Sequence, residues 1–288
     1  MNRKICLLFS IALFSANILS GASFKPANLT AYDAITVPGR SVILTAEIDK
    51  KGLLFAADLK GEKIYFSIDG SAAGESRSND EGVATLNYAF AKPGEYELEV
   101  KISTASAYRA EPAAAKIFCS DRRRPAIVVD IDHTVADVSW ETYIFKSNKD
   151  VKPLKDAPEV MRKLSAEYDI LFVTKRDEMF LKKTEEWLRM YRFPDAPVFF
   201  WDLGSYPLGA AKYKTGRICE LQNTWSNILI GIGDQKTDIE AYRANCLEYV
   251  IIIGKRGAGR PGVTYVSGWN EIGKMLLGKT KIGGIGGR

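Results

Sequence analysis

The pattern of hydrophobic and polar residues changes near residue 120. Between residues 29 and 118 apolar and polar residues alternate in short runs interrupted by turn residues, which is typical of antiparallel strands with one exposed face. The clearest runs are residues 41–47, 63–68 and 96–102, and Asp69-Gly70 and Pro93-Gly94 mark turns between them. This half of the chain therefore predicts a sandwich of antiparallel strands without evident chemistry.

Beyond residue 125 the strands become continuously apolar and alternate with helical patterns. Residues 126–131 have the composition of a parallel strand that is buried on both faces. Further strands are predicted at residues 168–174, 198–201, 228–232 and 249–253, with helices starting near Asp156 and Asp177 and covering 216–222 and 237–245. Repeated strand–helix units predict an open, mostly parallel α/β sheet, and such sheets bind ligands at the carboxyl ends of their strands.

Length and the amino-terminal pattern set the domain organisation. The 288 residues are 46% hydrophobic and suffice for two cores, predicted at residues 23–119 and 120–288, with a flexible glycine-rich tail at 279–288. Residues 5–19 are apolar, follow Arg3 and Lys4, and are too short for the roughly 20 residues that cross a bilayer. We therefore expect residues 1–22 to be a signal peptide, and the protein to be exported to a periplasmic or extracellular location, or anchored to the membrane if the signal is retained.

Charge and residue counts exclude several classes of function. Residues 120–288 contain 27 basic and 22 acidic side chains, too weak a bias for nucleic-acid binding, so no nucleic-acid partner is expected. The three arginines at 122–124 are interpreted as a solvated linker. The single histidine, His133, makes a Ser-His-Asp triad or a histidine-rich zinc site improbable. Without the signal peptide, Cys119, Cys219 and Cys246 remain, which leaves open one Cys219–Cys246 disulfide.

Carboxylates gather where the first and fourth strands of the second half end. Asp130 and Asp132 lie on the same side of an extended chain, and the fourth strand runs into Asp234 and Asp238. Unpaired acids at the end of a buried strand are costly unless a cation offsets their charge. Mg²⁺ suits this set because it accepts one or two carboxylates together with water and phosphate oxygens.

Four motifs in this order resemble those of the haloacid dehalogenase (HAD)-type phosphatases. They are D-I-D-H-T at 130–134, V-T-K-R-D at 173–177, a lysine near 214 and G-D-Q-K-T-D at 233–238. The resemblance covers about residues 123–255 and extends to the lipin-like branch, which includes phosphatidate phosphatases and a domain shared with phosphatidylinositol-transfer proteins. It implies a HAD-like Rossmannoid parallel sheet. The first half resembles bacterial immunoglobulin-like modules, which implies an immunoglobulin-like β-sandwich.

The resemblance implies catalytic roles for four residues. Asp130 attacks phosphorus and becomes an aspartyl-phosphate, and Asp132 protonates the leaving oxygen and later deprotonates water. Thr174 hydrogen-bonds a phosphoryl oxygen. Lys214 stabilises the charge on the transferred group, although Lys212 remains an alternative.

The remaining implied roles concern the metal and the substrate. Mg²⁺ is held by Asp130, the Asp132 carbonyl and Asp234, and Asp238 orients this metal shell from behind. The residues expected to contact substrate are Thr134, Lys175 and Arg176. For Lys175 and Arg176, steering of an anionic head group and a plain solvated loop are equally good interpretations.

Spacing limits the size of any lid over the site. The segments from Thr134 to Asp156 and from Thr174 to Lys214 are too short for a full cap domain. An open site favours a bulky phosphomonoester, with phosphatidate or another phospholipid as the leading expectation and contact with a membrane surface as a consequence. Trp140, Tyr143, Ile144 and Phe145 either form an apolar rim for an acyl chain or belong to the core.

Two other interpretations compete with the phosphatase. A lipin-like module that binds phosphatidate without hydrolysing it, joined to an adhesion-type sandwich, would not need Asp132 as a second acid. A phosphorelay receiver with Asp130 as the acceptor is disfavoured by the export signal and by Asp132. The sequence therefore favours an exported, Mg²⁺-dependent phosphatase.

Overall fold

The computed structural model describes residues 24–51, 57–121, 124–201, 209–254 and 260–278. The predicted signal peptide, the Gly-rich tail and two of the three linker arginines, Arg122 and Arg123, lie outside these residues. Within the described ranges, no helix has the length and apolar character needed to cross a membrane.

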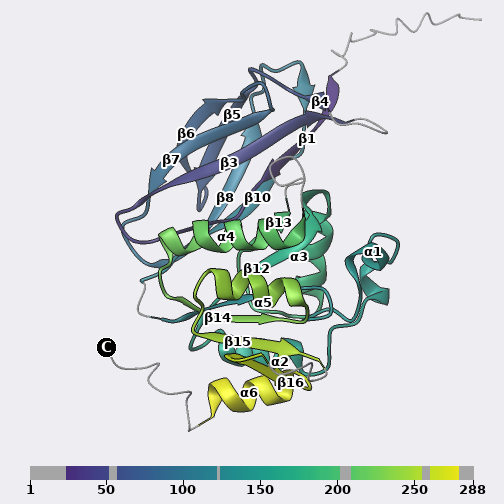
Figure 1. Cartoon of the computed structure of the whole chain (residues 1–288). Helices are drawn as coiled ribbons and strands as arrows, with labels where there is room; N and C mark the ends of the chain where they lie inside the picture. Colours follow the sequence, from purple (N-terminus) through teal and green to yellow (C-terminus); the bar gives the residue numbers. More distant parts are fainter. Residues whose placement is uncertain (1–23, 52–56, 122–123, 202–208, 255–259, 279–288) are drawn as a thin grey trace, which may run out of the picture.

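The first part of the chain is a β-sandwich of two five-stranded sheets (Figure 1). In one sheet β3 pairs with β1, β4 and β7, and β1 also pairs with β9; the other has the order β2-β10-β8-β5-β6. Their bounds are β1 Lys25–Ala31, β2 Ala34–Thr36, β3 Ser41–Lys50, β4 Ala57–Asp58, β5 Lys63–Ile68, β6 Ser71–Arg77, β7 Val83–Ala89, β8 Gly94–Ile102, β9 Tyr108–Arg109 and β10 Ala113–Cys119. Inward-facing side chains such as Leu44, Ile48, Ile64 and Leu98 fill the space between the sheets, which confirms the predicted sandwich.

The second part is a six-stranded, fully parallel sheet with the strand order β13-β12-β11-β14-β15-β16. The strands are β11 Ala126–Val129, β12 Asp169–Asp177, β13 Val198–Trp201, β14 Ile228–Gly233, β15 Tyr249–Ile253 and β16 Val263–Val266. The helices are α1 Trp140–Tyr143, η1 Asn148–Asp150, α2 Ala157–Leu164, η2 Glu178–Phe180, α3 Leu181–Met190, α4 Ala210–Thr224, α5 Lys236–Ala244 and α6 Trp269–Leu277. The predicted parallel α/β architecture is therefore present.

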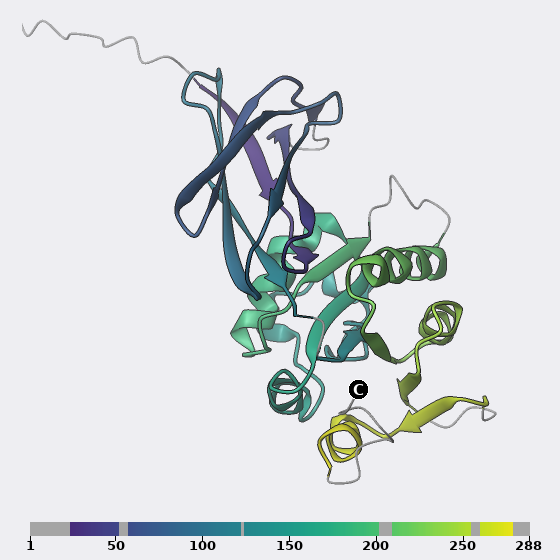
Figure 2. The ribbon, with the colours of Figure 1, turned by 90° about the vertical axis from the view of Figure 1, so that its left-hand side faces the viewer.

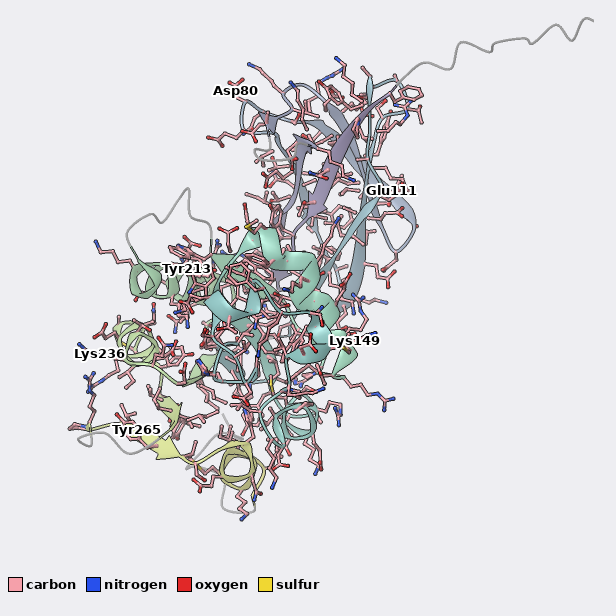
Figure 3. The ribbon with its side chains drawn as sticks, turned by 90° about the vertical axis from the view of Figure 1, so that its right-hand side faces the viewer. Asp80, Glu111, Lys149, Tyr213, Lys236 and Tyr265 are labelled. Atoms are coloured by element: carbon pink, nitrogen blue, oxygen red, sulfur yellow. The ribbon has the colours of Figure 1, made fainter. Side chains whose placement is uncertain are left out.

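Alternate side chains of β11 enter two different apolar cores. Ile127 and Val129 pack with side chains of α2, α3 and α6, whereas Ala126 and Val128 pack with side chains of α4 and α5. Tyr213 on α4 and Lys236 on α5 mark the second group of helices in Figure 3. Burial on both faces explains why these strands are continuously apolar in sequence.

The sandwich lies next to the parallel-sheet part (Figure 2), and the two parts share an apolar core. Ile35, Val37 and Phe118 of the sandwich belong to the same apolar cluster as Val128 and the α4 and α5 side chains. The Trp225 indole Nε1 donates a hydrogen bond of 2.8 Å to the Thr36 carbonyl at this junction. The two parts are therefore packed together and not merely linked.

Two partly buried carboxyl groups, Asp33 and Glu185, lie at the same junction. Asp33 accepts hydrogen bonds from the backbone N–H groups of Lys116 (2.8 Å) and Val198 (3.2 Å), which tie it to both parts of the chain. Glu185 of α3 lines the adjoining cleft with Asp33. Burial, followed by the negative charge of Asp33, raises the pKa of Glu185 to about 7. Ionisation of Glu185 near neutral pH therefore lowers the stability of the folded protein.

Glu185→Gln is expected to stabilise the protein at high pH only. The folded-state pKa of Glu185 lies above its unfolded value, so its favourable contribution is complete below about pH 4.5 and is lost as the pH rises through about 7. Denaturant unfolding should show equal free energies for variant and wild type at pH 4.5, and a gain for the variant of about 2 kcal/mol at pH 8. The exposed neighbour Glu186 provides the control, Glu186→Gln. A gain independent of pH would contradict the assignment.

Candidate functional site

The predicted site residues come from the carboxyl ends of three adjacent strands. Asp130 and Asp132 directly follow β11, Thr174 lies in β12, and Asp234 follows β14. β11 pairs with both β12 and β14, so the three strand ends are neighbours. The structure therefore brings together groups that are about one hundred residues apart in sequence.

The loop after β11 is a tight turn. The backbone N–H groups of Thr134, Val135 and Ala136 all point to the Ile131 carbonyl, at 2.8–3.2 Å. His133 adopts a left-handed backbone conformation (φ 55°) and is exposed. The buried Thr134 hydroxyl has no hydrogen-bond partner among the described residues. This hydroxyl is thus available to a group that enters the site.

Glycines let the loop after β14 approach α5 closely. A Cβ atom on Gly233 would lie 2.5 Å from the Asp238 carboxyl carbon, so a larger residue would displace that carboxylate. Asp238 Oδ2 accepts hydrogen bonds from the backbone N–H groups of Asp234 (3.2 Å) and Gln235 (3.0 Å). Asp238 therefore holds the loop that carries Asp234.

Asp130, Asp234 and Asp238 form a cluster with Lys214 from α4. One carboxylate oxygen of each aspartate lies within 4.8 Å of the others. Lys214 Nζ lies 2.6 Å from Asp130 Oδ1 and 2.6 Å from Asp238 Oδ1. Lys212, the alternative lysine, is exposed. The structure thus brings Lys214, and not Lys212, to the aspartates.

The electrostatics of this cluster are dominated by burial. Burial raises the pKa of Asp130 to about 7; Lys214 opposes this shift, and Asp238 and Asp132 add to it. Burial, followed by the charge of Asp238, raises the pKa of Asp234 to about 6. Burial alone would lower the pKa of Lys214, but Asp130 and Asp238 raise it above its usual value. One lysine therefore does not neutralise three carboxylates.

A divalent cation fits this donor set. Asp234 Oδ1 is buried and has no hydrogen-bond partner among the described residues, so it is free to bind a metal ion. Both Asp238 oxygens are already used, one by Lys214 and the other by the backbone N–H groups of the loop. Asp130 and Asp234 are thus the best-placed carboxylates to face the ion, with Asp238 behind them. Hard carboxylate oxygens of this kind are the ligands that Mg²⁺ prefers.

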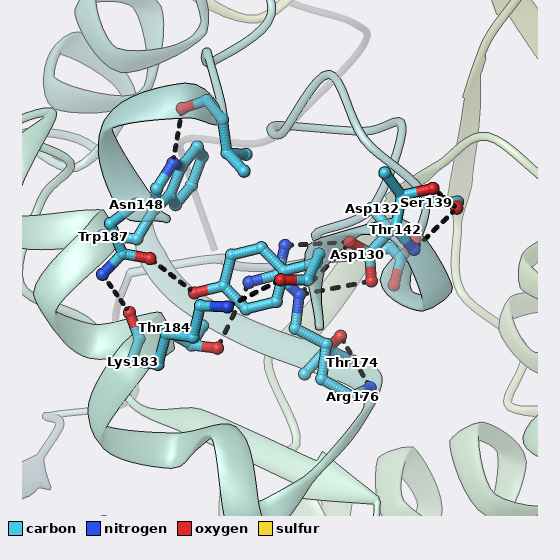
Figure 4. Close-up of polar contacts among 12 residues, drawn as sticks. Asp130, Asp132, Ser139, Thr142, Asn148, Thr174, Arg176, Lys183, Thr184 and Trp187 are labelled. Atoms are coloured by element: carbon cyan, nitrogen blue, oxygen red, sulfur yellow. Dashed lines mark hydrogen bonds and ion pairs between the residues drawn. The ribbon is translucent and has the colours of Figure 1, made fainter. Parts of the chain in front are cut away.

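The carboxylate of Asp132 lies outside the cluster and pairs with Arg176 (Figure 4). Arg176 Nη2 is 2.8 Å from Asp132 Oδ1, and both side chains are almost completely buried. The interpretation of Arg176 as part of a solvated or head-group-steering loop was wrong, because its strand position points inward. The predicted contribution of Asp132 to the metal came from its carbonyl, and this pairing leaves that role untouched.

The other predicted residues take different positions. Thr174 is fully buried, and its hydroxyl accepts a hydrogen bond of 3.2 Å from the Arg176 N–H, while Lys175 is half-buried. Among the four residues of the proposed rim, Tyr143 belongs to the core and Phe145 is 88% exposed. The core interpretation therefore holds for Tyr143, and the apolar rim stays a prediction for the exposed Phe145.

The Cys219–Cys246 disulfide is absent. Both cysteines are exposed and free, and Cys119 is buried and free. Cys219 lies on α4 and Cys246 follows α5. The described residues are therefore held together without a disulfide.

The sequence analysis missed the surroundings of Arg176. Tyr143 and Trp187, from α1 and α3, place their rings 3.6 and 5.9 Å from the guanidinium carbon. The available signal was the strand alternation, because residues 174 and 176 share one face and Thr174 had already been placed in the site. A charged residue on that face has to find a buried partner.

Comparisons with known proteins give one family match, in the second part of the chain. Residues 127–253 match the family model of the LNS2 domain of PITM 1-3. No curated protein matches the chain in sequence.

Solved structures show weaker likenesses. The fibronectin(III)-like modules of Clostridium thermocellum CbhA are 17% identical, with 32% of this chain and 95% of that chain covered and a TM-score of 0.24. The D00-D0 domain of intimin is 21% identical, with 32% and 46% covered and a TM-score of 0.25. The Pnkp1/Rnl/Hen1 RNA repair complex is 13% identical, with 43% and 40% covered and a TM-score of 0.35.

The family match falls on the strands that carry Asp130, Thr174 and Asp234. Over residues 127–253 the chain is thus similar to the LNS2 domain, a phosphatase-related module of the HAD-like lipin family.

Proposed function

We propose that residues 120–288 form a Mg²⁺-dependent phosphomonoesterase that works through an aspartyl-phosphate on Asp130. The observation that carries this proposal is the arrangement of Asp130, which is buried, contacts Lys214 at 2.6 Å and clusters with Asp234 and Asp238. Asp132 supplies a separate carboxylate that a simple metal-binding or phosphate-binding site would not need. The similarity of residues 127–253 to a phosphatase-related module supports the same function.

The chain's own residues account for each step. Asp130 Oδ forms a bond to phosphorus while the bond from phosphorus to the leaving oxygen breaks, and Asp132 donates a proton to that oxygen. A water then attacks phosphorus, Asp132 takes its proton, and the Asp130 carboxylate is released. Lys214 and the hydroxyls of Thr174 and Thr134 bind the phosphoryl oxygens. Asp130, the Asp132 carbonyl and Asp234 would hold Mg²⁺, which would supply positive charge between the nucleophile and the phosphate.

The surroundings of the site favour a bulky substrate at a lipid surface. Phe145 and Met179 are the most exposed large apolar side chains among the described residues, at 88% and 77%. Their segments pack together, since Lys183 Nζ donates hydrogen bonds to the Tyr143 carbonyl (2.6 Å) and the Ile144 carbonyl (3.3 Å). Apolar side chains with nearby lysines suit an anionic membrane interface. Phosphatidate is therefore the leading substrate, met by an exported protein.

Phosphate release measured with p-nitrophenyl phosphate and with phosphatidate vesicles tests the function. We expect release from both substrates with Mg²⁺, and a loss of at least about 100-fold when EDTA removes the ion, because the cation stabilises the charge of the transferred group. Activity that is independent of metal would contradict the mechanism. Binding to phosphatidate vesicles without phosphate release would instead support a non-catalytic lipid-binding module.

A further inference from the structure

Arg176 is completely buried beside the site and directs its guanidinium at one carboxylate. Nη2 donates to Asp132 Oδ1 at 2.8 Å, and Nε lies 3.2 Å from Oδ1 and 3.3 Å from Oδ2. Nη1 donates to the Thr184 hydroxyl at 3.2 Å. Figure 4 shows this network between the end of β12 and α3.

Two aromatic rings fix the guanidinium in place. The Tyr143 ring centre lies 3.6 Å from the guanidinium carbon, a stacking distance, and the Trp187 ring lies at 5.9 Å. Each ring is itself anchored, since the Tyr143 hydroxyl donates to Asn148 Oδ1 (3.0 Å) and the Trp187 indole donates to the Val151 carbonyl (2.9 Å). Arg176 is therefore held in one rotamer by the segment that follows the first motif and by α3.

The two carboxylate oxygens of Asp132 differ in their hydrogen bonds to Arg176. Oδ1 accepts the short hydrogen bond and one of the longer ones, whereas Oδ2 accepts only the contact at 3.3 Å. An oxygen with one long contact keeps lone pairs for a further proton or hydrogen bond. The guanidinium thus holds Asp132 Oδ1 in place and leaves Oδ2 free to donate or accept a proton.

Stability alone does not explain this pair. A buried ion pair contributes little net stability, because both charges lose their hydration, and apolar residues of similar size often serve as well. The pair also keeps the Asp132 carboxylate apart from Asp130, Asp234 and Asp238, which gather around Lys214. Rigid support of a reacting group by a neighbouring charge is typical of preorganised sites.

We propose that Arg176 is a positioning residue for the acid–base steps, which presents Asp132 Oδ2 to the leaving oxygen and then to the attacking water. This inference rests on the proposed phosphatase function. Arg176 does not contact the substrate itself, and Tyr143 and Thr184 act by holding it.

The dependence on the leaving group separates this role from a structural one. The p-nitrophenolate ion is stable enough to leave without a proton, whereas the glycerol oxygen of glycerol phosphate must be protonated as it leaves. The ratio kcat/KM reports only the steps up to departure of the leaving group, so it isolates the acid step. We expect Arg176→Met to lower kcat/KM for glycerol phosphate about 100-fold and that for p-nitrophenyl phosphate less than about threefold. Arg176→Lys keeps the positive charge but loses the paired N–H groups of the guanidinium, so its kcat/KM for glycerol phosphate should lie between those of Arg176→Met and the wild type.

Three further variants complete the design. Asp132→Asn should show the same selectivity, and adding Arg176→Met to it should cause no further loss of kcat/KM for glycerol phosphate. Thr184→Val removes one anchor of Arg176 without unpairing Asp132, so it reports a smaller selective loss even if Arg176→Met fails to fold. Arg243→Met, at an exposed arginine of α5, is the control.

An equal loss for both substrates, or no loss, in the folded variants would overturn the positioning role and leave the proposed function intact. A wild-type protein that is inactive on both substrates with Mg²⁺ would overturn the proposed function and this inference together. A selective loss in Thr184→Val and Arg176→Met, with wild-type activity in Arg243→Met, would support it.

Discussion

Asp130→Asn is expected to abolish phosphate release, with a loss in kcat on the order of 10³-fold or more. The amide is a far weaker nucleophile than the carboxylate. Asp238, the other carboxylate at Lys214, is already held by the backbone N–H groups of Asp234 and Gln235, so we do not expect it to replace Asp130. The measurement is turnover of p-nitrophenyl phosphate with Mg²⁺, together with a rapid acid quench that looks for a phosphorylated protein.

Asp137→Asn provides the matched control, because Asp137 lies in the same loop and its side chain is exposed. It should turn over at the wild-type rate. Full activity or a trapped phosphoprotein in Asp130→Asn would reject Asp130 as the nucleophile. Thermal unfolding of both variants should resemble that of the wild type, so that an inactive protein is not mistaken for an unfolded one.

Lys214→Met is expected to impair both stability and catalysis. The substitution leaves Asp130 and Asp238, each at present 2.6 Å from the ammonium, buried without their cation. Removing one partner from a buried ion pair costs about 3–5 kcal/mol of unfolding free energy, and loss of a preorganised charge costs about 10²–10³-fold in kcat. Denaturant unfolding in EDTA and turnover with Mg²⁺ measure the two effects.

The exposed Lys212 offers a control with the same chemistry two residues away. Lys212→Met should match the wild type in both measurements. Mg²⁺ should restore part of the stability lost in Lys214→Met, since it offsets the same carboxylates. Equal behaviour of the two lysine variants would show that Lys214 does not neutralise the site.

Much of the α/β part was predictable because its strands are buried on both faces. The continuous apolar runs at Ala126–Val129 and Val198–Trp201 are short and rich in β-branched or aromatic residues, which favours buried strands. Once the strand ends were placed, the meeting of Asp130 with Asp234 followed from the parallel topology. Lys214 was assigned from the resemblance to the phosphatase motifs, because the helix predicted at 216–222 begins two residues after it.

The ends of helices and the last two elements of the chain were harder to predict from the sequence. The predicted helix at 216–222 is the middle of α4 Ala210–Thr224, because Gly216 reads as a break and yet lies inside a helix supported by tertiary packing. β16 Val263–Val266 and α6 Trp269–Leu277 were not expected, since β16 is a short edge strand of mixed polarity. Both elements are stabilised by contacts with the rest of the sheet and its core, which the local sequence does not reveal.

Contacts between distant elements were the least predictable. Nothing in the spacing of Tyr143 and Trp187 indicates that both rings enclose Arg176, because they reach it from different helices. The sequence left Tyr143 open between an apolar rim and the core, and it did not indicate the partner of either ring. Arg176 was placed at the surface because charged residues usually lie there.

The packing of Ile35, Val37 and Phe118 against the parallel-sheet part has a mechanical consequence. Because the two parts share an apolar core, they are expected to move as one body. Any attachment at the far end of the sandwich would therefore also fix the orientation of the candidate site.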